Sequence, residues 1–226
     1  MEEKKVATIG VKKVNGKFKV EPKDPLNTEI RDLLGNRFIM KRGQTEKEKE
    51  ETTFTEDTTS AEFNGCKYVG LFFSAGWCPA SKTMLKSLKN FYTDANLQQR
   101  TLEVVLVSSD RSADDWQQWH GTMSWLSLDW SDKKNDEMRK KFEVRGIPRL
   151  VILDAKTGFP ITEKGRKDLK DDVKGVYESW DKLYELKKVW AVENAKTEAI
   201  SIEERLEREE KEREKKKRDE ERAAAA

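Results

Sequence analysis

The stretch VGLFFSAGWCPAS, Val69 to Ser81, decides the fold because it joins a buried strand to a helix through a cysteine. The run from Lys67 to Ala75 is apolar at nearly every position and rich in aromatic and branched side chains, which is typical of a strand buried on both faces. Residues 79–95 carry apolar side chains at helical spacing and begin with proline, which costs no hydrogen bond in a first helical turn. The sequence therefore predicts that Cys78 lies at a helix N-terminus, where the helix dipole favours a thiolate.

The motif around this cysteine has no second sulfur. The position three residues after Cys78, where a CxxC site holds the cysteine that resolves a mixed disulfide, is Ser81. A hydroxyl cannot resolve such a bond, although it could donate a hydrogen bond to the thiolate. We therefore predict that Cys78 and Ser81 form a catalytic site restricted to monothiol chemistry. Natural divergence and the engineering of a substrate trap both produce a CxxS motif, and the alternative for Cys78 is an inert buried thiol.

Strands and helices alternate downstream of the motif. The patterns predict a strand over 102–110, helices over 112–120 and 132–142, and a further strand ending at Asp154. Such alternation is typical of an open sheet that is covered by helices on both faces.

At this point the segment from about Gly65 to Trp180 resembles the nucleoredoxin and tryparedoxin branch of the thioredoxin-like family. The matching motifs stand in order along the chain: VGLFFSAGWCPAS at 69–81, FY at 91–92, EVVLVSSDRS at 103–112, MSWLSLDWSD at 123–132, KKFEVRGIPRLVILDAKTG at 140–158 and, more weakly, DDVKGVYESW at 171–180. The resemblance implies an α/β, thioredoxin-like fold, with a central mixed sheet flanked by helices.

The resemblance also implies roles for individual residues. Cys78 corresponds to the attacking cysteine, and Pro148 to a cis proline that faces it. The backbone beside a cis proline at this place can pair with an extended substrate as an added strand, and Ile147 would provide that edge. Trp77, Pro79, Ile147 and Pro148 are accordingly the predicted substrate-binding residues.

The chain departs from the family motif at four positions. Ala80, Ser81 and Lys82 stand where the family usually has proline, cysteine and arginine, and Arg149 follows Pro148 where a small hydroxyl residue is common. The strand before the motif also lacks an acidic side chain that could carry a proton. These departures predict at most a weak monothiol oxidoreductase.

The remaining reactive side chains do not complete another site. Cys66 precedes the strand that delivers Cys78, so at about 3.3 Å per residue the two should lie roughly 25 Å apart, too far for a disulfide. Cys66 is predicted to be a reduced structural thiol. His120 is predicted near the end of a surface helix, as a solvated or dipole-facing imidazole. Two cysteines and one histidine cannot close a typical zinc site, and no phosphate-binding motif occurs, so we predict no metal and no cofactor.

Polar extensions flank the predicted core, and we divide the chain into an N-terminal extension (1–60), a thioredoxin-like domain (61–180) and a helical tail (181–226). In the extension, Asn15-Gly16 predicts a β-hairpin, Gly35 ends a short helix, and residues 36–41 suit a strand. A polar loop over 41–60 should have little to bury.

The tail combines an apolar seam with a run of charge. Val192, Ala195, Ala199, Ile202 and Leu206 are spaced as on one helix face, which predicts a short docking helix, while the helix before it should fold back on its own domain through Trp180, Leu183, Tyr184 and Trp190. From Glu203 to Arg222 ten residues are acidic and nine basic, with five acid-first pairs four residues apart. Such pairs each add about 0.2 to 0.5 kcal/mol to a long charged helix, and plain solvation is the alternative role of the run.

Composition bounds the partners. A net charge of +2 gives no case for nucleic acid, and no apolar stretch suits a secretory signal or a membrane span. The few cysteines fit a reducing, cytoplasmic compartment. The predicted function is monothiol, mixed-disulfide chemistry through Cys78 with glutathione or a protein thiol as partner. The alternative is a redox-inactive adaptor subunit of a larger complex, such as a cytoskeletal or axonemal (ciliary) assembly, anchored by the C-terminal helix.

Overall fold

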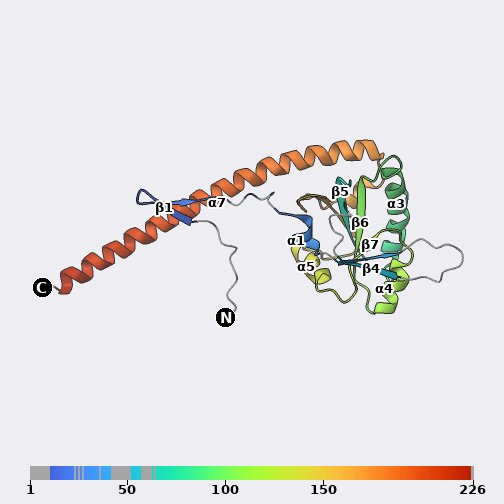
Figure 1. Ribbon diagram of the computed structural model, residues 1–226, viewed down its shortest axis with the longest axis horizontal. Coiled ribbons are helices and arrows are strands. Elements are labelled where there is room, and N and C mark those ends of the chain that lie inside the picture. The colour runs from blue at the N-terminus through green and yellow to red at the C-terminus, as the bar shows by residue number, and fades with distance from the viewer. Residues whose placement is uncertain are drawn as a thin grey trace. The chain divides into compact units, whose positions relative to one another are not determined.

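The computed structural model describes residues 11–22, 24, 26, 28–35, 37–41, 52–56, 63 and 65–224. The chain divides into two compact units: a core unit of residues 28–186, and a terminal unit of residues 1–27 together with 187–226 (Figure 1). The predicted domain boundaries after residues 60 and 180 stay a prediction.

A mixed sheet forms the centre of the core unit. Its seven strands in the described part of the chain follow the order β4-β3-β7-β6-β5-β8-β9. The central strand β5 pairs in parallel with β6 and antiparallel with β8. The bounds of the strands are β3 (Arg37–Lys41), β4 (Thr52–Glu56), β5 (Tyr68–Ser74), β6 (Leu102–Ser108), β7 (Leu126–Ser127), β8 (Arg149–Asp154) and β9 (Pro160–Thr162).

Helices cover both faces of this sheet. The core-unit helices are α1 (Ile30–Leu34), α3 (Pro79–Ala95), α4 (Ala113–His120), α5 (Lys134–Lys141), α6 (Gly165–Asp168) and the first turns of α7 (Val173–Ala224). Side chains alternate along β5, so Phe72 packs in one cluster with residues of α3, α4 and α7, whereas Leu71 and Phe73 pack in a second cluster with α1 and α5. Figure 1 shows α1 and α5 on one side of the sheet and α3 and α4 on the other. The predicted thioredoxin-like α/β fold is confirmed.

The strand β4 was not predicted, because its residues lie in the polar segment that we interpreted as a loop. Residues 52–56 pair antiparallel with β3 from Arg37↔Glu56 to Lys41↔Thr52. The sequence TTFTE is rich in β-branched and aromatic residues, which suit a strand, but its pairing partner lies outside the segment itself. The other residues of the predicted loop, 42–51 and 57–60, lie outside the described residues.

The N-terminal hairpin is confirmed and belongs to the terminal unit. Strands β1 (Val11–Val14) and β2 (Lys17–Val20) pair antiparallel, and Asn15 and Gly16 between them both have positive φ angles, as a type I′ turn requires.

This hairpin contacts the part of α7 that carries the predicted apolar seam. The backbone N–H of Val20 donates to a Glu203 carboxylate oxygen at 2.6 Å, and Lys13 forms an ion pair with Glu210. Val20 and Ala199 are both buried, and Figure 1 shows the hairpin beside the helix. The chain's own N-terminal strands therefore contact α7 at Glu203, within the stretch that carries the predicted seam, and at Glu210 in the charged run.

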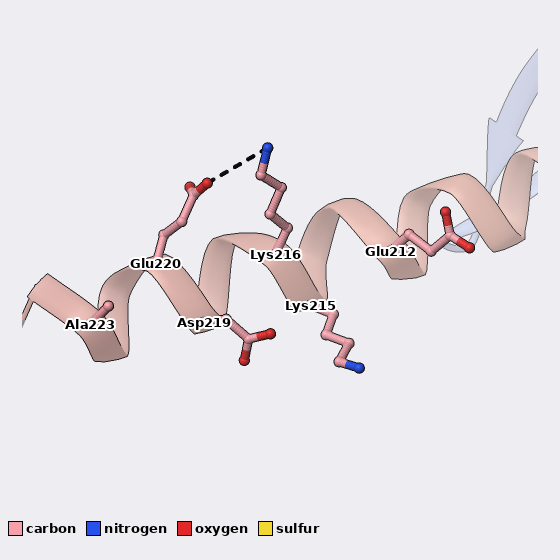
Figure 2. Close-up of a pocket in the computed structure, with 6 residues that line it drawn as sticks. All are labelled: Glu212, Lys215, Lys216, Asp219, Glu220 and Ala223. Atoms are coloured by element: carbon pink, nitrogen blue, oxygen red, sulfur yellow. Dashed lines mark ion pairs between the residues drawn. The ribbon is translucent and has the colours of Figure 1, made fainter.

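Farther along α7, every residue from Lys211 to Ala223 is exposed. Two ion pairs in the charged run join Arg205 to Glu209 and Lys216 to Glu220, and both place the base first. Figure 2 shows the second pair on one side of the helix, with Lys215 and Asp219 pointing away from it. None of the five predicted acid-first pairs is within ion-pair distance in this described segment, because these solvated side chains have several partners of similar energy to choose from. No helix among the described residues is both long and apolar enough to span a bilayer.

The first turns of α7 close the core unit. Trp180 is buried at 1% exposure, and Leu183 and Tyr184 pack against the same cluster. The prediction that Trp190 joins them is wrong, because its side chain is 66% exposed in the terminal unit. Trp190 lies seven residues after Leu183, on nearly the same face of the helix, which is why the spacing predicted its burial.

Candidate active site

Cys78 occupies the junction between the central strand and helix α3. Its backbone is extended, with φ of −91° and ψ of 115°, and its carbonyl oxygen accepts from the N–H groups of Ser81 and Lys82 at 3.1 and 3.2 Å. Cys78 is thus the N-cap of α3, followed by Pro79 at the first helical position. Pro79 itself is exposed, while the cysteine is 8% exposed.

The sulfur faces the loop that precedes β8. Cys78 Sγ lies 3.8 Å from the carbonyl oxygen of Ile147, to which the thiol can donate. The peptide bond between Ile147 and Pro148 is cis, as the resemblance implies, and Pro148 is buried. The structure therefore brings together Cys78, Ile147 and Pro148 from segments 69 residues apart.

The surroundings of the sulfur lower the pKa of Cys78 from its ordinary value. The largest cause is the side-chain hydroxyl of Ser81, followed by the backbone N–H groups of Ser81 and Ala80 and the positive charge of Arg166, while burial opposes them. The Ser81 side chain is fully buried, and its Oγ has no hydrogen-bond partner of normal geometry within the described chain. This hydroxyl is therefore available to the thiolate once Cys78 loses its proton.

We expect the variant Ser81→Ala to raise the pKa of Cys78, because the hydroxyl that favours the thiolate is lost. The same change removes a buried hydroxyl without a partner, so the free energy of unfolding should rise by about 1 kcal/mol at a pH where Cys78 is a thiol. Alkylation rates measured across pH give the pKa, and denaturant titration gives the stability. A lower pKa in Ser81→Ala would contradict the assignment, and Ser87→Ala, on the exposed side of α3, is the matched control.

Trp77 is held beside the cysteine by the loop that follows β6. Its side chain is 50% exposed, and its indole N–H donates to the carbonyl oxygen of Ser109 at 3.1 Å. The guanidinium of Arg111 lies over the ring, 5.1 Å from its centroid. The indole therefore presents one apolar face near the sulfur in a fixed orientation.

Residues after β6 that were not assigned a role from sequence complete this surface. The carboxylate of Asp110 accepts from the N–H of Gly76 and from the hydroxyl of Ser108, both at 2.8 Å, and its burial raises its pKa. The indole N–H of Trp130 donates to the carbonyl oxygen of Asp110 at 3.1 Å. Asp110 thus fixes the turn before Trp77. The sequence does contain a signal for this role of Asp110. The residues SSD stand at the carboxyl end of β6, which runs parallel to β5, and the carboxyl ends of parallel strands meet at one edge of a sheet.

Cys66 and His120 lie outside this site. Cys66 precedes the seven-residue strand that Cys78 follows, and no disulfide joins the two, so the prediction that they form none is confirmed. His120 does end its helix, but it is not solvated. It is buried, stacks on Trp116 and places Nε2 2.9 Å from the carbonyl oxygen of Trp125. Its burial depends on tertiary packing beside Trp116 and Trp125, which the sequence of the helix alone does not show.

A hollow on α7, lined by Glu212, Lys215, Lys216, Asp219, Glu220 and Ala223, is no alternative active site. All of its residues come from a single exposed helix, as Figure 2 shows, and they include no cysteine, serine, threonine or histidine.

A cysteine at a helix N-terminus opposite a cis proline, beside a central parallel pair of strands, defines a thioredoxin-like protein. A thioredoxin-like family model matches residues 65–159. Nucleoredoxin from Xenopus laevis is 36% identical over 107 residues, covering 47% of this chain and 26% of the relative. Tryparedoxin from Trypanosoma brucei brucei is 34% identical over 115 residues, covering 50% of this chain and 79% of the relative.

Solved structures agree with this match. A crystal structure of thioredoxin from Wuchereria bancrofti is 28% identical and covers 66% of this chain and 96% of its own, with a TM-score of 0.52. The chain belongs to the thioredoxin-like family, in the branch of the nucleoredoxins and tryparedoxins. It spans about a quarter of the length of the nucleoredoxin that it matches.

Proposed function

We propose that this protein carries out thiol–disulfide exchange of the monothiol type, with Cys78 as its nucleophile. The observation that carries the proposal is the position of the Cys78 sulfur, 3.8 Å from the Ile147 carbonyl oxygen beside a cis proline, together with surroundings that lower its pKa. The kinship with nucleoredoxins and tryparedoxins supports thiol–disulfide chemistry as the general class.

In the proposed reaction, the Cys78 thiolate attacks one sulfur of a substrate disulfide. The substrate S–S bond breaks, a Cys78 mixed disulfide forms, and the other substrate sulfur leaves as a thiolate that takes up a proton. Because position 81 is a serine, the protein supplies no second thiol, so two external thiols complete the cycle. The first attacks the substrate sulfur of the mixed disulfide, releases Cys78 and forms a disulfide between itself and the substrate. The second attacks that disulfide, which leaves the substrate fully reduced and joins the two external thiols in one disulfide.

The neighbours of Cys78 have separate roles in this proposal. The Ser81 hydroxyl stabilises the thiolate as donor, and Trp77 with Pro79 shapes the surface on which the substrate lies. The Ile147 backbone pairs with an extended substrate segment, which Pro148 orients toward the sulfur. The external thiol would be glutathione or a protein thiol, in a reducing compartment such as the cytoplasm.

The test follows adduct formation on intact protein. We expect one equivalent of a disulfide peptide to label the protein. The labelling rate should reach half of its maximum at a pH below the ordinary thiol pKa of about 8.5. The label should be lost in Cys78→Ser and retained in the matched variant Cys66→Ser. Absence of any adduct would overturn the proposal, while vigorous catalytic reduction of insulin that depends on Cys78 would overturn its monothiol restriction.

A second candidate is a redox-inactive adaptor subunit of a cytoskeletal or axonemal assembly. The observation that favours it is the exposure of large apolar side chains on α7 in the terminal unit, where Val189, Trp190 and Ile200 are between 55% and 67% exposed. Under this function, Cys78→Ser should leave incorporation of the protein into its native complex unchanged, and Trp190→Glu should reduce it. Loss of incorporation in Cys78→Ser would exclude a purely structural role.

A further inference from the structure

A pocket of about 510 Å³ adjoins the cis-proline loop in the core unit. Its walls come from the end of α5 and the following turn on one side, and from the start of β8 and the residue after β9 on the other. The lining residues are Lys141, Phe142, Glu143, Arg145, Gly146, Arg149 and Glu163.

This pocket is next to the backbone carbonyl group that contacts the Cys78 sulfur. Gly146 lines the pocket, and the next residue, Ile147, places its carbonyl oxygen 3.8 Å from Cys78 Sγ. Successive Cα atoms are about 3.8 Å apart, and side chains alternate between the two sides of a strand. A substrate strand that pairs with Ile147 while its cysteine meets Cys78 would therefore direct a neighbouring side chain toward the pocket.

The segment that forms most of this pocket is strongly basic. Residues 139–149 contain five basic residues and a single acidic one, Glu143. Arg149 forms an ion pair with Glu163 and donates to the backbone carbonyl oxygen of Glu143 at 3.3 Å. The fork of its guanidinium is thus held across the pocket in a defined orientation.

Two further cations of the pocket are available to a ligand. Lys141 and Arg145 are exposed, and neither forms an ion pair with any residue that the structure describes. The lining holds three basic and two acidic residues, a net charge of +1; of the two acids, Glu163 pairs with Arg149 and Glu143 lies on the same turn as Arg145. The net positive charge matches a carboxylate, which arginine binds with suitable geometry.

We propose that this basic pocket selects disulfide substrates that carry an acidic side chain close to the cysteine attacked by Cys78. The inference rests on the proposed thiol–disulfide function and adds a substrate class, an acidic peptide disulfide. Because Lys141 and Arg145 lie at an exposed rim, the selection acts mainly on the rate of association and weakens at high salt.

The experiment uses the full chain in a Cys66→Ser background and three peptides that differ only at the positions flanking one cysteine. The flanks carry aspartate, lysine or glutamine, and the cysteine is activated as a mixed disulfide with 2-thiopyridine, whose release reports attack by Cys78. We expect the aspartate peptide to react about tenfold faster than the lysine peptide at low ionic strength, and the ratio to fall toward one in 0.5 M salt.

Charge reversal should remove this preference. In Lys141→Glu/Arg145→Glu the aspartate peptide should lose its advantage, whereas Lys86→Glu/Lys89→Glu on the exposed side of α3 makes the same charge change and should keep it. Alkylation by neutral iodoacetamide corrects each variant for the intrinsic reactivity of Cys78. Equal rates for the three peptides would overturn the substrate class and leave the proposed function standing. No reaction with any peptide would overturn the proposed function and this inference with it.

Discussion

Replacing Ser81 with cysteine is expected to convert this protein into a dithiol oxidoreductase. In the variant Ser81→Cys, the reduction of insulin by dithiothreitol should accelerate by at least about a hundredfold over the unmodified chain. The reason is that resolution of the mixed disulfide becomes intramolecular, and well-placed intramolecular groups gain very high effective concentrations. Resolution of the mixed disulfide would then no longer depend on an external thiol.

The local geometry suits this exchange. Residues three apart on a helix have Cβ atoms about 5 to 6 Å apart, which is close to the separation that a disulfide spans after small adjustment. The Ser81 side chain is fully buried and its hydroxyl has no partner of normal geometry among the described residues, so no hydrogen bond is lost when sulfur replaces oxygen. Substitution should therefore leave the fold intact.

The matched control for this variant is Ala80→Cys. Residue 80 is exposed and lies two positions from Cys78, so its side chain does not face the nucleophile around the helix. It should give no acceleration. If Ser81→Cys also stayed at the rate of the unmodified chain, while its Cys78 still alkylated normally, the missing sulfur would not be what limits turnover.

The elements that were predicted well are those whose signal is local. The run before Cys78 and the helical spacing after it give β5 and α3, and the Asn15-Gly16 turn gives the hairpin. The edge strand β4 and the two-residue strand β7 were not predicted, because each depends on pairing with a distant strand rather than on its own sequence.

The same difference separates the parts of the candidate site. Cys78 and Pro148 belong to motifs that can be recognised in a short segment. In the structure the Cys78 sulfur contacts the carbonyl oxygen of Ile147, the residue that is joined to Pro148 by the cis peptide bond. Asp110 could not be assigned in this way. Its contact with Gly76 exists because β5 and β6 run parallel in a register that aligns Ser74 with Ser108, so the residues that follow both strands meet.

Trp180→Ala is expected to cause the largest loss of stability, about 3 to 5 kcal/mol in the free energy of unfolding. The Trp180 side chain is 1% exposed, and its ring lies 5.0 Å from that of Tyr68 and 6.0 Å from that of Phe91. Its indole N–H donates to the Asp168 carboxylate at 2.8 Å. Truncation would leave a cavity where α3, β5 and the first turns of α7 meet, and a carboxylate without its donor.

Denaturant titration followed by far-UV circular dichroism measures this loss, which should also lower the melting temperature by about 6 to 20 °C. Trp180→Phe keeps most of the ring and loses only the N–H donor, so it should cost roughly 1 to 2 kcal/mol. Trp190→Ala, in which the removed ring is exposed, should change stability little. If Trp180→Ala cost no more than Trp190→Ala, the first turns of α7 would not be part of the cooperative core, and the helix would have to be regarded as an appendage along its whole length.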